Sequence, residues 1–183
     1  MMMTDMLSDE LLFDQFTKGD MTAFEHLYSR YRQSLYTFLL RSCSDHAEAD
    51  DIYQDAWSRV IYAAVPFTSG SFRAYIFKIA RNLQIDSHRR SHIHLVDELE
   101  LLEDVVDAKP NMARTLDGED CGELLVSEVA LLPGEQRDAF LLKEESGLTL
   151  EQIANMLEVG RETIKSRLRY AMKRLRAALE ECL

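Results

Sequence analysis

The segment over residues 148–176 constrains the fold of this chain more than any other, and it reads LTLEQIANMLEVGRETIKSRLRYAMKRLR. Thr149 and Gln152 have the spacing of a capping box, which predicts the start of a helix. This short helix is expected over about Leu150 to Leu157, with its buried residues being Ile153, Ala154 and Leu157. Gly160 then interrupts the pattern where it can cap a second helix.

The second helix of this segment has one apolar face and one basic face. The apolar face is formed at helical spacing by Ile164, Leu168, Ala171, Met172, Leu175 and Leu179. On another face, Arg161, Lys165 and Arg169 recur every four residues. A short helix, a tight turn and a basic helix are typical of a helix-turn-helix, whose second helix enters the DNA major groove. The alternative is a basic amphipathic helix in a bundle, but the capped helix and glycine turn favour DNA binding.

Charge is distributed in blocks along a chain of 183 residues whose net charge is -11. Residues 66–96 carry five Lys or Arg against one acid, and residues 161–183 carry seven against three. Residues 97–130 carry eleven acids and two bases, a local net charge of -9. Phosphate repels an acidic protein, but two basic blocks separated by an acidic one predict two DNA-binding modules and a linker.

The first half of the chain has the apolar spacing of several helices. We expect a helix that ends near Gly19, a second from about residue 22 to 43 and a third from about residue 45 to 64. Thr22 and Glu25 have capping-box spacing at the start of the second helix. In the third helix an apolar stripe predicts burial, and the exposed face carries Asp50, Asp51, Gln54, Asp55 and Ser58.

A loop over Val65 to Ser71 precedes the most informative helix of this half, expected over Phe72 to about Arg90. Its core side is predicted to hold Phe72, Ile76, Ile79, Ala80 and Leu83. Its basic surface is predicted to hold Arg73, Phe77, Lys78, Arg81, Gln84, His88, Arg89 and Arg90. Basic residues interleaved with aromatic rings are what single-stranded DNA binding requires. An ordinary surface helix fits the pattern equally well.

The second half begins with an acidic stretch that is expected to be mobile in the free protein. Order resumes with a helix that ends at Pro133, followed by a helix over about Glu135 to Glu145. The sequence therefore predicts an all-α chain of two small helical domains joined by a flexible acidic linker. We place the domains at residues 1–94 and 123–183 and the linker at 95–122.

Membrane and secretion signals do not occur in the sequence. No apolar run approaches the roughly 20 residues of a membrane span, and the first residues lack the basic start of a signal peptide. We therefore expect a cytoplasmic protein. The cysteines, without CxxC spacing, are expected to be reduced thiols: Cys43, Cys121 and Cys182.

Motifs for catalysis or cofactor binding are also missing from the sequence. It has no glycine-rich phosphate loop, no HExxH and no GxSxG, so we expect neither an enzyme nor a cofactor, and no small-molecule substrate. A metal site built from His88, His92, His94 and a cysteine is disfavoured, because the ligands lack the usual spacing.

Three stretches resemble segments of bacterial sigma factors. Residues 50–61 read DDIYQDAWSRVI and resemble the polymerase-binding helix. Residues 72–90 read FRAYIFKIARNLQIDSHRR and resemble the helix that melts the promoter. Residues 132–176 include LTLEQIANMLEVGRETIKSRLRY and resemble the C-terminal DNA-binding domain. Their order and spacing are similar to the extracytoplasmic-function group, and the resemblance covers almost the whole chain apart from the linker.

The resemblance implies roles for residues of the first domain. In the family, the helix at 50–61 docks on the clamp helices of core RNA polymerase, which implies polymerase binding by Asp50, Asp51, Gln54 and Asp55. The loop and helix that follow capture a flipped base of the promoter -10 element, at a cost of about a few kcal/mol of unstacking. The -10 DNA-binding residues are then Phe67, Thr68, Ser69, Arg73, Lys78, Arg81, Asn82, Asp86, Arg89 and Arg90.

The resemblance also implies that the second domain reads the -35 element. The residues that fall there are Arg161, Glu162, Thr163, Lys165, Ser166 and Arg169, and those expected to contact phosphates are Arg167, Lys173 and Arg174. Gly160 departs from the serine often found at this turn. In the family the linker threads polymerase channels, and its negative charge is suited to basic channel walls. A solvated spacer between the two domains would explain the same charge equally well.

Two hypotheses of different kinds follow. The first is an alternative sigma factor whose partners are core RNA polymerase, promoter DNA and, as is usual in this group, an anti-sigma factor, which we expect to be membrane-linked. The second is a stand-alone helix-turn-helix regulator whose N-terminal half senses a signal or dimerises. The stretch at residues 50–61 favours the first, because a regulator has no reason to carry it.

Overall fold

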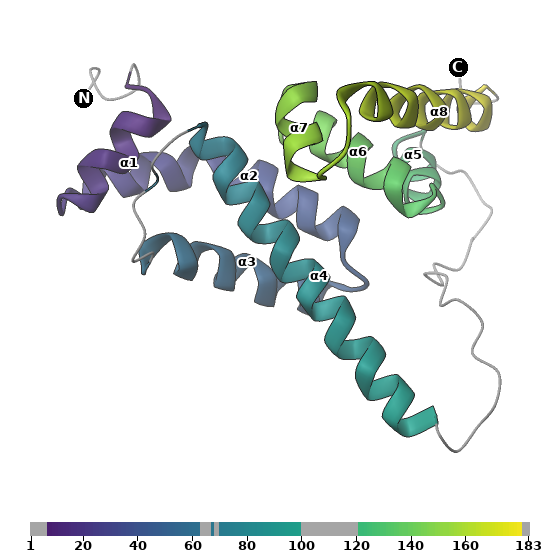
Figure 1. Ribbon diagram of the computed structural model, residues 1–183, viewed down its shortest axis with the longest axis horizontal. Helices are drawn as coiled ribbons and strands as arrows, with labels where there is room; N and C mark the ends of the chain where they lie inside the picture. Colours follow the sequence, from purple (N-terminus) through teal and green to yellow (C-terminus); the bar gives the residue numbers. More distant parts are fainter. Residues whose placement is uncertain (1–6, 63–66, 68–69, 100–120, 181–183) are drawn as a thin grey trace.

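Eight α-helices and no strand make up the part of the chain that the computed structural model describes, namely residues 7–62, 67, 70–99 and 121–180 (Figure 1). For residues 91–99 only the backbone is described. The first four helices are α1 (Asp9–Thr17), α2 (Met21–Ser42), α3 (His46–Ile61) and α4 (Phe72–Leu99). The last four are α5 (Cys121–Ala130), α6 (Gly134–Glu144), α7 (Leu150–Met156) and α8 (Arg161–Leu179). The all-α prediction is confirmed.

Short polar side chains cap the first three helices. Ser8 accepts a hydrogen bond from the Leu11 amide at the start of α1, and Asp45 accepts one from Glu48 at the start of α3. At the start of α2, Asp20 Oδ1 accepts from the Thr22 amide at 2.9 Å. The predicted capping box at Thr22 was therefore wrong by two residues, because an aspartate already satisfies the free amides of this turn.

Helix α2 runs through the core of the first four helices, with Leu27, Tyr31, Leu35, Phe38 and Leu39 buried. Helices α1, α3 and α4 all pack against it. Four of the five α4 residues predicted to be in the core are buried, namely Phe72, Ile76, Ala80 and Leu83, and the fifth, Ile79, is half-buried against the same cluster.

Two residues predicted on the basic surface of α4 are buried instead. Phe77 is 0% exposed and packs edge-on against Phe38, with 5.5 Å between the ring centres. Gln84 is 8% exposed and donates a hydrogen bond from Nε2 to the Ser42 carbonyl. The apolar stripe of α4 is wider than the sequence pattern indicated, because α4 contacts both α2 and α3.

Helix α4 is also longer than predicted. It continues past Arg90 to Leu99, and its C-terminal end projects beyond the other helices (Figure 1). It thus includes the first residues of the predicted linker. His92 and His94 lie in this extension, and the arrangement of their side chains falls outside the described part, as does the rest of the predicted linker between residues 100 and 120.

The helix-turn-helix forms as predicted. Thr149 and Gln152 make the reciprocal hydrogen bonds of a capping box at the start of α7. Gly160 is the N-cap of α8, without a side-chain hydrogen bond. Between the helices Glu158 adopts a left-handed backbone conformation with φ of 54°, which lets the chain turn within a few residues. Ile153 and Ala154 are buried as predicted, whereas Leu157 is only half-buried, because the helix ends at Met156 and Leu157 is its C-cap. Met156, which the pattern did not single out, is buried in its place.

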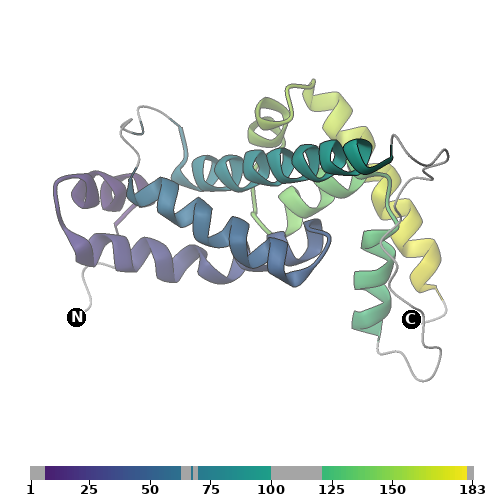
Figure 2. The same cartoon turned by 90° about the horizontal axis from the view of Figure 1, so that it is seen from below.

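The two groups of helices pack against each other. Helices α5 and α6 lie against α2, while α7 lies against α4. Both views show α6 and α7 close to the N-terminal helices, with α5 beside α8 (Figure 2). Buried residues of both groups belong to one continuous apolar cluster.

The cysteines differ from the prediction of three reduced thiols. Cys121 is disulfide-bonded, and Cys182 lies outside the described residues. Cys43 is a free thiol, and burial raises its pKa to about 12, so it stays protonated at neutral pH. Within the described residues no helix is long and apolar enough to cross a bilayer.

The capping box generates a prediction about the stability of the C-terminal helices. Replacing Thr149 with Ala removes the oxygen that accepts the Gln152 amide, so we expect the free energy of unfolding to fall by about 1 kcal/mol. Thr149→Ser keeps this oxygen and should stay near wild type. Chemical denaturation followed by circular dichroism measures both, and equal stability of the two variants would contradict the prediction.

Candidate nucleic-acid and partner-binding surfaces

A groove between α3 and α4 brings together most of the predicted polymerase-binding residues. Asp50, Asp51, Gln54 and Asp55 are all exposed, and the last three line an open groove of about 560 Å³. Ile52 and Leu83 also line it, and its α4 side carries Ser87, His88 and Arg90. The groove offers carboxylates on one side and basic groups on the other, which suits a charged partner.

Fixed contacts hold α3 in place behind this groove. Tyr36 of α2 donates a hydrogen bond to Asp50 Oδ1 at 2.7 Å. Glu48 accepts hydrogen bonds from the Ser87 hydroxyl at 2.6 Å and the Ser44 amide at 2.9 Å. Burial acts to raise the pKa of Glu48, but these hydrogen bonds outweigh it and lower the pKa, so the carboxylate stays charged.

The predicted -10 residues of α4 differ in their exposure and in their partners, and Arg73, described below, is among the exposed ones. Lys78, Asn82, Arg89 and Arg90 are exposed, and Asp86 lies half-buried with its carboxylate 3.6 Å from Arg89. In the preceding loop Phe67 is half-buried against Phe13 and Tyr75, with ring centres 6.0 and 5.7 Å away. Thr68 and Ser69 lie outside the described residues.

Arg73 contacts the C-terminal helices. Its Nη1 donates a hydrogen bond to the Ser146 carbonyl at 2.8 Å, and its guanidinium lies 5.4 Å from the centre of the Tyr31 ring. Gly147 follows with a left-handed φ of 64°, and a Cβ atom there would be 2.9 Å from Arg73 Nη1. Glycine at this position therefore allows both the turn and the close approach of the guanidinium.

Two ion pairs join the same two groups of helices. Arg81 Nη2 lies 3.2 Å from Asp138 Oδ2, and Arg41 pairs with Glu145. Both pairs are mostly shielded, since the Arg81 side chain is 20% exposed and that of Glu145 is 16% exposed. Arg81 Nε is buried and has no hydrogen-bond partner among the described residues. Arg81 and Arg73, both predicted to bind DNA, are thus bonded to groups of the C-terminal half.

The predicted -35 residues form the exposed N-terminal face of α8. Arg161, Glu162, Thr163, Lys165 and Arg169 are exposed, while Ser166 is half-buried and donates to the Thr163 carbonyl. Lys165 Nζ lies 2.7 Å from Glu162 Oε1, and this hydrogen bond lowers the pKa of Glu162. The Arg169 guanidinium lies over the Tyr170 ring, 5.1 Å from its centre.

The three predicted phosphate contacts differ in their surroundings. Lys173 is exposed. Arg174 is exposed and lies 3.5 Å from the Leu131 carbonyl. Arg167, with 16% of its side chain exposed, pairs with Glu135 of α6 at 2.7 Å. Arg167 therefore joins α8 to α6, and a contact with phosphate would compete with this pair.

Comparison with known proteins identifies both halves of the chain. Residues 27–92 match the family model of sigma-70 region 2, and residues 129–177 match that of sigma-70 region 4. The ferric citrate uptake sigma factor FecI of Escherichia coli K12 is 30% identical over 176 residues, which cover 93% of this chain and 94% of FecI. The chain belongs to the extracytoplasmic-function sigma factors. The ECF RNA polymerase sigma factor SigL of Mycobacterium tuberculosis H37Rv is 31% identical, over 85% of this chain and 88% of the SigL chain.

Two solved structures have a similar fold. One is the sigma factor RpoE in complex with the anti-sigma factor NepR from Bartonella quintana, with a TM-score of 0.64 and 25% sequence identity. The match covers 86% of this chain and 96% of the RpoE chain. The other is CnrH in complex with the cytosolic domain of CnrY, with a TM-score of 0.62 and 20% sequence identity. This match covers 94% of this chain and 97% of the CnrH chain. The latter likeness concerns the fold alone.

Several residues at these surfaces were missed by the sequence analysis. Tyr36, Glu48 and Ser87 hold the groove, but their partners are remote in sequence. Asp138 of α6 and Glu145, the C-cap of α6, are seven residues apart and thus lie on the same side, opposite basic residues of α2 and α4. Acids at this spacing on an amphipathic helix are a signal that could have indicated a basic partner helix within the chain.

The ion pairs between the two halves generate a prediction about opening. Replacing Asp138 and Glu145 with Ala removes both acidic partners, and partly exposed pairs of this kind contribute about 1 kcal/mol or less each. We expect the population in which helices α5–α8 are separated from helices α1–α4 to increase severalfold. Small-angle X-ray scattering would show this as an increased radius of gyration. The matched control is Glu144→Ala with Glu151→Ala, at exposed positions of α6 and α7. A double variant as compact as this control would contradict the prediction.

Proposed function

We propose that this sigma factor binds core RNA polymerase through the groove beside α3 and directs transcription initiation at promoters with two separate elements. The observation that carries this proposal is that one chain presents two unlike basic surfaces, on α4 and on α8, together with an acidic exposed face on α3. The α3 carboxylates would meet phosphate unfavourably, so this face is suited to a protein partner. We assign it to the polymerase clamp.

The two basic surfaces take different parts of the promoter. The helix α4 and the loop before it receive the separated strand of the -10 element, with Lys78, Arg89 and Arg90 on phosphates. The exposed N-terminal face of α8 enters the major groove of the -35 element, where arginine and lysine address guanine and glutamate accepts from cytosine. Residues 1–94 and 123–183 act as the two domains, and residues 95–122 as the acidic linker.

Promoter binding also requires the two halves to separate. Elements centred about 25 base pairs apart are separated by about 85 Å of duplex. In this structure α7, which precedes the reading helix α8, contacts α4 directly. Both surfaces can therefore occupy one promoter only after Arg73 and Arg81 leave their C-terminal partners, and phosphates then replace the Ser146 carbonyl and the Asp138 carboxylate.

The protein acts without catalysing a reaction of its own, and it works in the cytoplasm where polymerase and promoter DNA are. An anti-sigma factor, membrane-linked, holds it inactive. Support for this partner comes from RpoE of Bartonella quintana, a relative in fold and sequence that is bound to the anti-sigma factor NepR. His88 and Arg90, which line the α4 side of the groove beside α3, are among the basic groups that such a partner would meet.

In vitro transcription with purified core polymerase and a library of random-sequence templates tests the proposal. We expect the added protein to give transcripts from a subset of templates that share two sequence elements. Core polymerase alone is the control. The absence of protein-dependent transcripts, together with a sequence-specific duplex footprint by the protein alone, would contradict the sigma assignment and support a stand-alone regulator.

Charge reversal on α3 tests the polymerase surface. We expect Asp51→Lys with Asp55→Lys to weaken binding to core polymerase at least tenfold, because like charges would oppose each other across the interface. The control is Asp14→Lys with Glu25→Lys, which makes the same charge change at exposed positions of α1 and α2. Surface plasmon resonance on immobilised core measures the affinity, and equal affinities for the two double variants would exclude the α3 face.

Substitution of Arg169 tests base reading by α8. If Arg169 contacts a base, Arg169→Ala should lower transcription about tenfold from the selected promoter and relax the preference at one -35 position. Lys173→Ala is the matched control, because a phosphate contact weakens all promoters alike. Transcription from templates with single substitutions in the -35 element distinguishes the two, and uniform loss for Arg169→Ala would assign it to phosphate.

A further inference from the structure

Helix α1 precedes the residues that match sigma-70 region 2, which begin at residue 27. It is nevertheless firmly packed, with Leu12 and Phe13 buried and contacts to both α2 and α4. Its nine residues are too few to be stable alone, so its position depends on these contacts. The side chains that α1 directs toward α4 lie beside the loop assigned above to the -10 element.

Phe13 is the apolar link between α1 and that loop. Its ring centre lies 6.0 Å from the ring of Phe67 in an edge-on arrangement. It also lies 5.2 Å from the ring of Phe72 and 5.9 Å from that of Tyr75, both in the first turn of α4. Phe13 therefore contacts the loop and the helix start together, and holds Phe67 against Tyr75.

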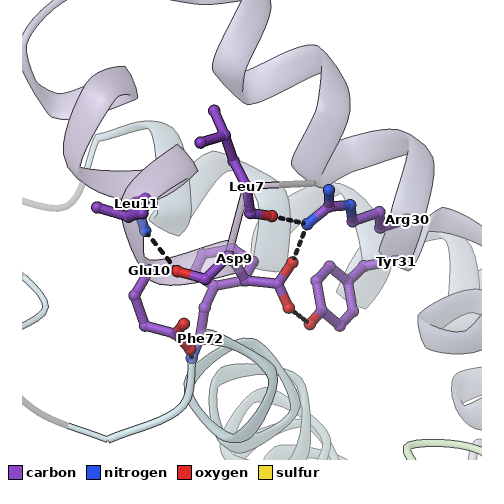
Figure 3. Close-up of polar contacts among 8 residues, drawn as sticks. Leu7, Asp9, Glu10, Leu11, Arg30, Tyr31 and Phe72 are labelled. Atoms are coloured by element: carbon purple, nitrogen blue, oxygen red, sulfur yellow. Dashed lines mark hydrogen bonds and ion pairs between the residues drawn. The ribbon is translucent and has the colours of Figure 1, made fainter. Parts of the chain in front are cut away.

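Glu10 is the polar link. Its Oε1 accepts a hydrogen bond at 3.2 Å from the backbone amide of Phe72, the first residue of α4 (Figure 3). The first amides of a helix have no partner within the helix, and a negative charge near them is favourable. Glu10 thus caps α4 from a different helix, 62 residues earlier in the chain.

A second carboxylate fixes α1 relative to α2. Asp9 Oδ1 lies 2.7 Å from Arg30 Nη1, and Asp9 Oδ2 accepts a hydrogen bond from the Tyr31 hydroxyl (Figure 3). Arg30 also donates to the Leu7 carbonyl at 2.9 Å. Burial, followed by the hydrogen bond with Asp9, raises the pKa of Tyr31, so its hydroxyl remains a donor at neutral pH. These contacts hold Glu10 where it can reach Phe72.

We propose that α1 is a positioning element for -10 recognition, in which Glu10 holds the first amide of α4 and Phe13 holds Phe67, so that Phe67 and the first turn of α4 meet the separated DNA strand in one geometry. This inference rests on the function proposed above. Glu10 and Phe13 act through Phe72 and Phe67, and we assign them no contact with DNA.

Variants of Glu10 test this role without removing core volume. Glu10→Ala loses the acceptor, whereas Glu10→Gln keeps an acceptor oxygen. The matched control is Asp14→Ala, which removes an exposed carboxylate paired with Lys18 on the same helix. In the free protein we expect faster amide hydrogen exchange at Phe72 in Glu10→Ala only. An exchange rate equal to that of the control would overturn the capping role.

A binding experiment tests the functional consequence, using holoenzyme assembled with each variant. The probe is a single-stranded oligonucleotide with the non-template -10 sequence of a promoter that the wild-type holoenzyme selects. We expect Glu10→Ala to bind this probe about fivefold more weakly, as the loss of a helix cap of ordinary strength gives. Glu10→Gln should bind within about twofold of wild type. Affinity for core polymerase and for a -35 duplex should not change.

Two results would overturn the positioning role. One is probe binding by Glu10→Ala that equals the control, and the other is a parallel loss of affinity for core and probe, which would indicate a general loss of structure. Failure of the proposed function is seen separately, since it would appear as the absence of promoter-dependent transcription by the wild-type holoenzyme before any variant is compared.

Discussion

Burial of helix α2 on several sides is the constraint on which the rest of the structure depends. Helices α1, α3 and α4 pack against it to form the N-terminal core, and α5 and α6 pack against it from the C-terminal half. Leu27, Leu35 and Leu39 are fully buried there. Because α2 is in contact with both halves, it orders the surfaces of α3 and α4 and also provides the site against which the C-terminal helices rest.

Electrostatics gives this packing a functional consequence. Arg73 and Arg81 carry positive charge of the kind that binds phosphate. In this structure they bind the Ser146 carbonyl and the Asp138 carboxylate of the C-terminal half instead. In the function proposed above, the bonds to Ser146 and Asp138 are exchanged for bonds to phosphate when the two halves separate. Under that proposal the compact state and DNA binding by α4 are alternatives, and a partner that binds one state better shifts the population toward it.

Much of the fold could be predicted from local chemistry. The capping box at Thr149, the turn at Gly160 and the apolar spacing of α8 depend on residues within a few positions of each other, and the structure confirms them. The predicted polar face of α3 is exposed for the same reason. The errors on α4 concern contacts that a helical pattern does not contain. Phe77 and Gln84 are buried because α2 and α3 both cover α4. The error at the start of α2 is a local one, since Asp20, two residues before Thr22, caps this helix in place of the predicted box.

The sequence by itself determined which segments become helices, where charge accumulates and which family motifs are present, because these depend on residues close together in the chain. Only the tertiary structure decided which predicted binding residues are occupied. Arg81 meets Asp138 across 57 positions, and the Phe72 amide meets Glu10 across 62. Such partners are chosen by the packing of whole helices, since a side chain can pair only with groups that the fold brings within hydrogen-bond distance.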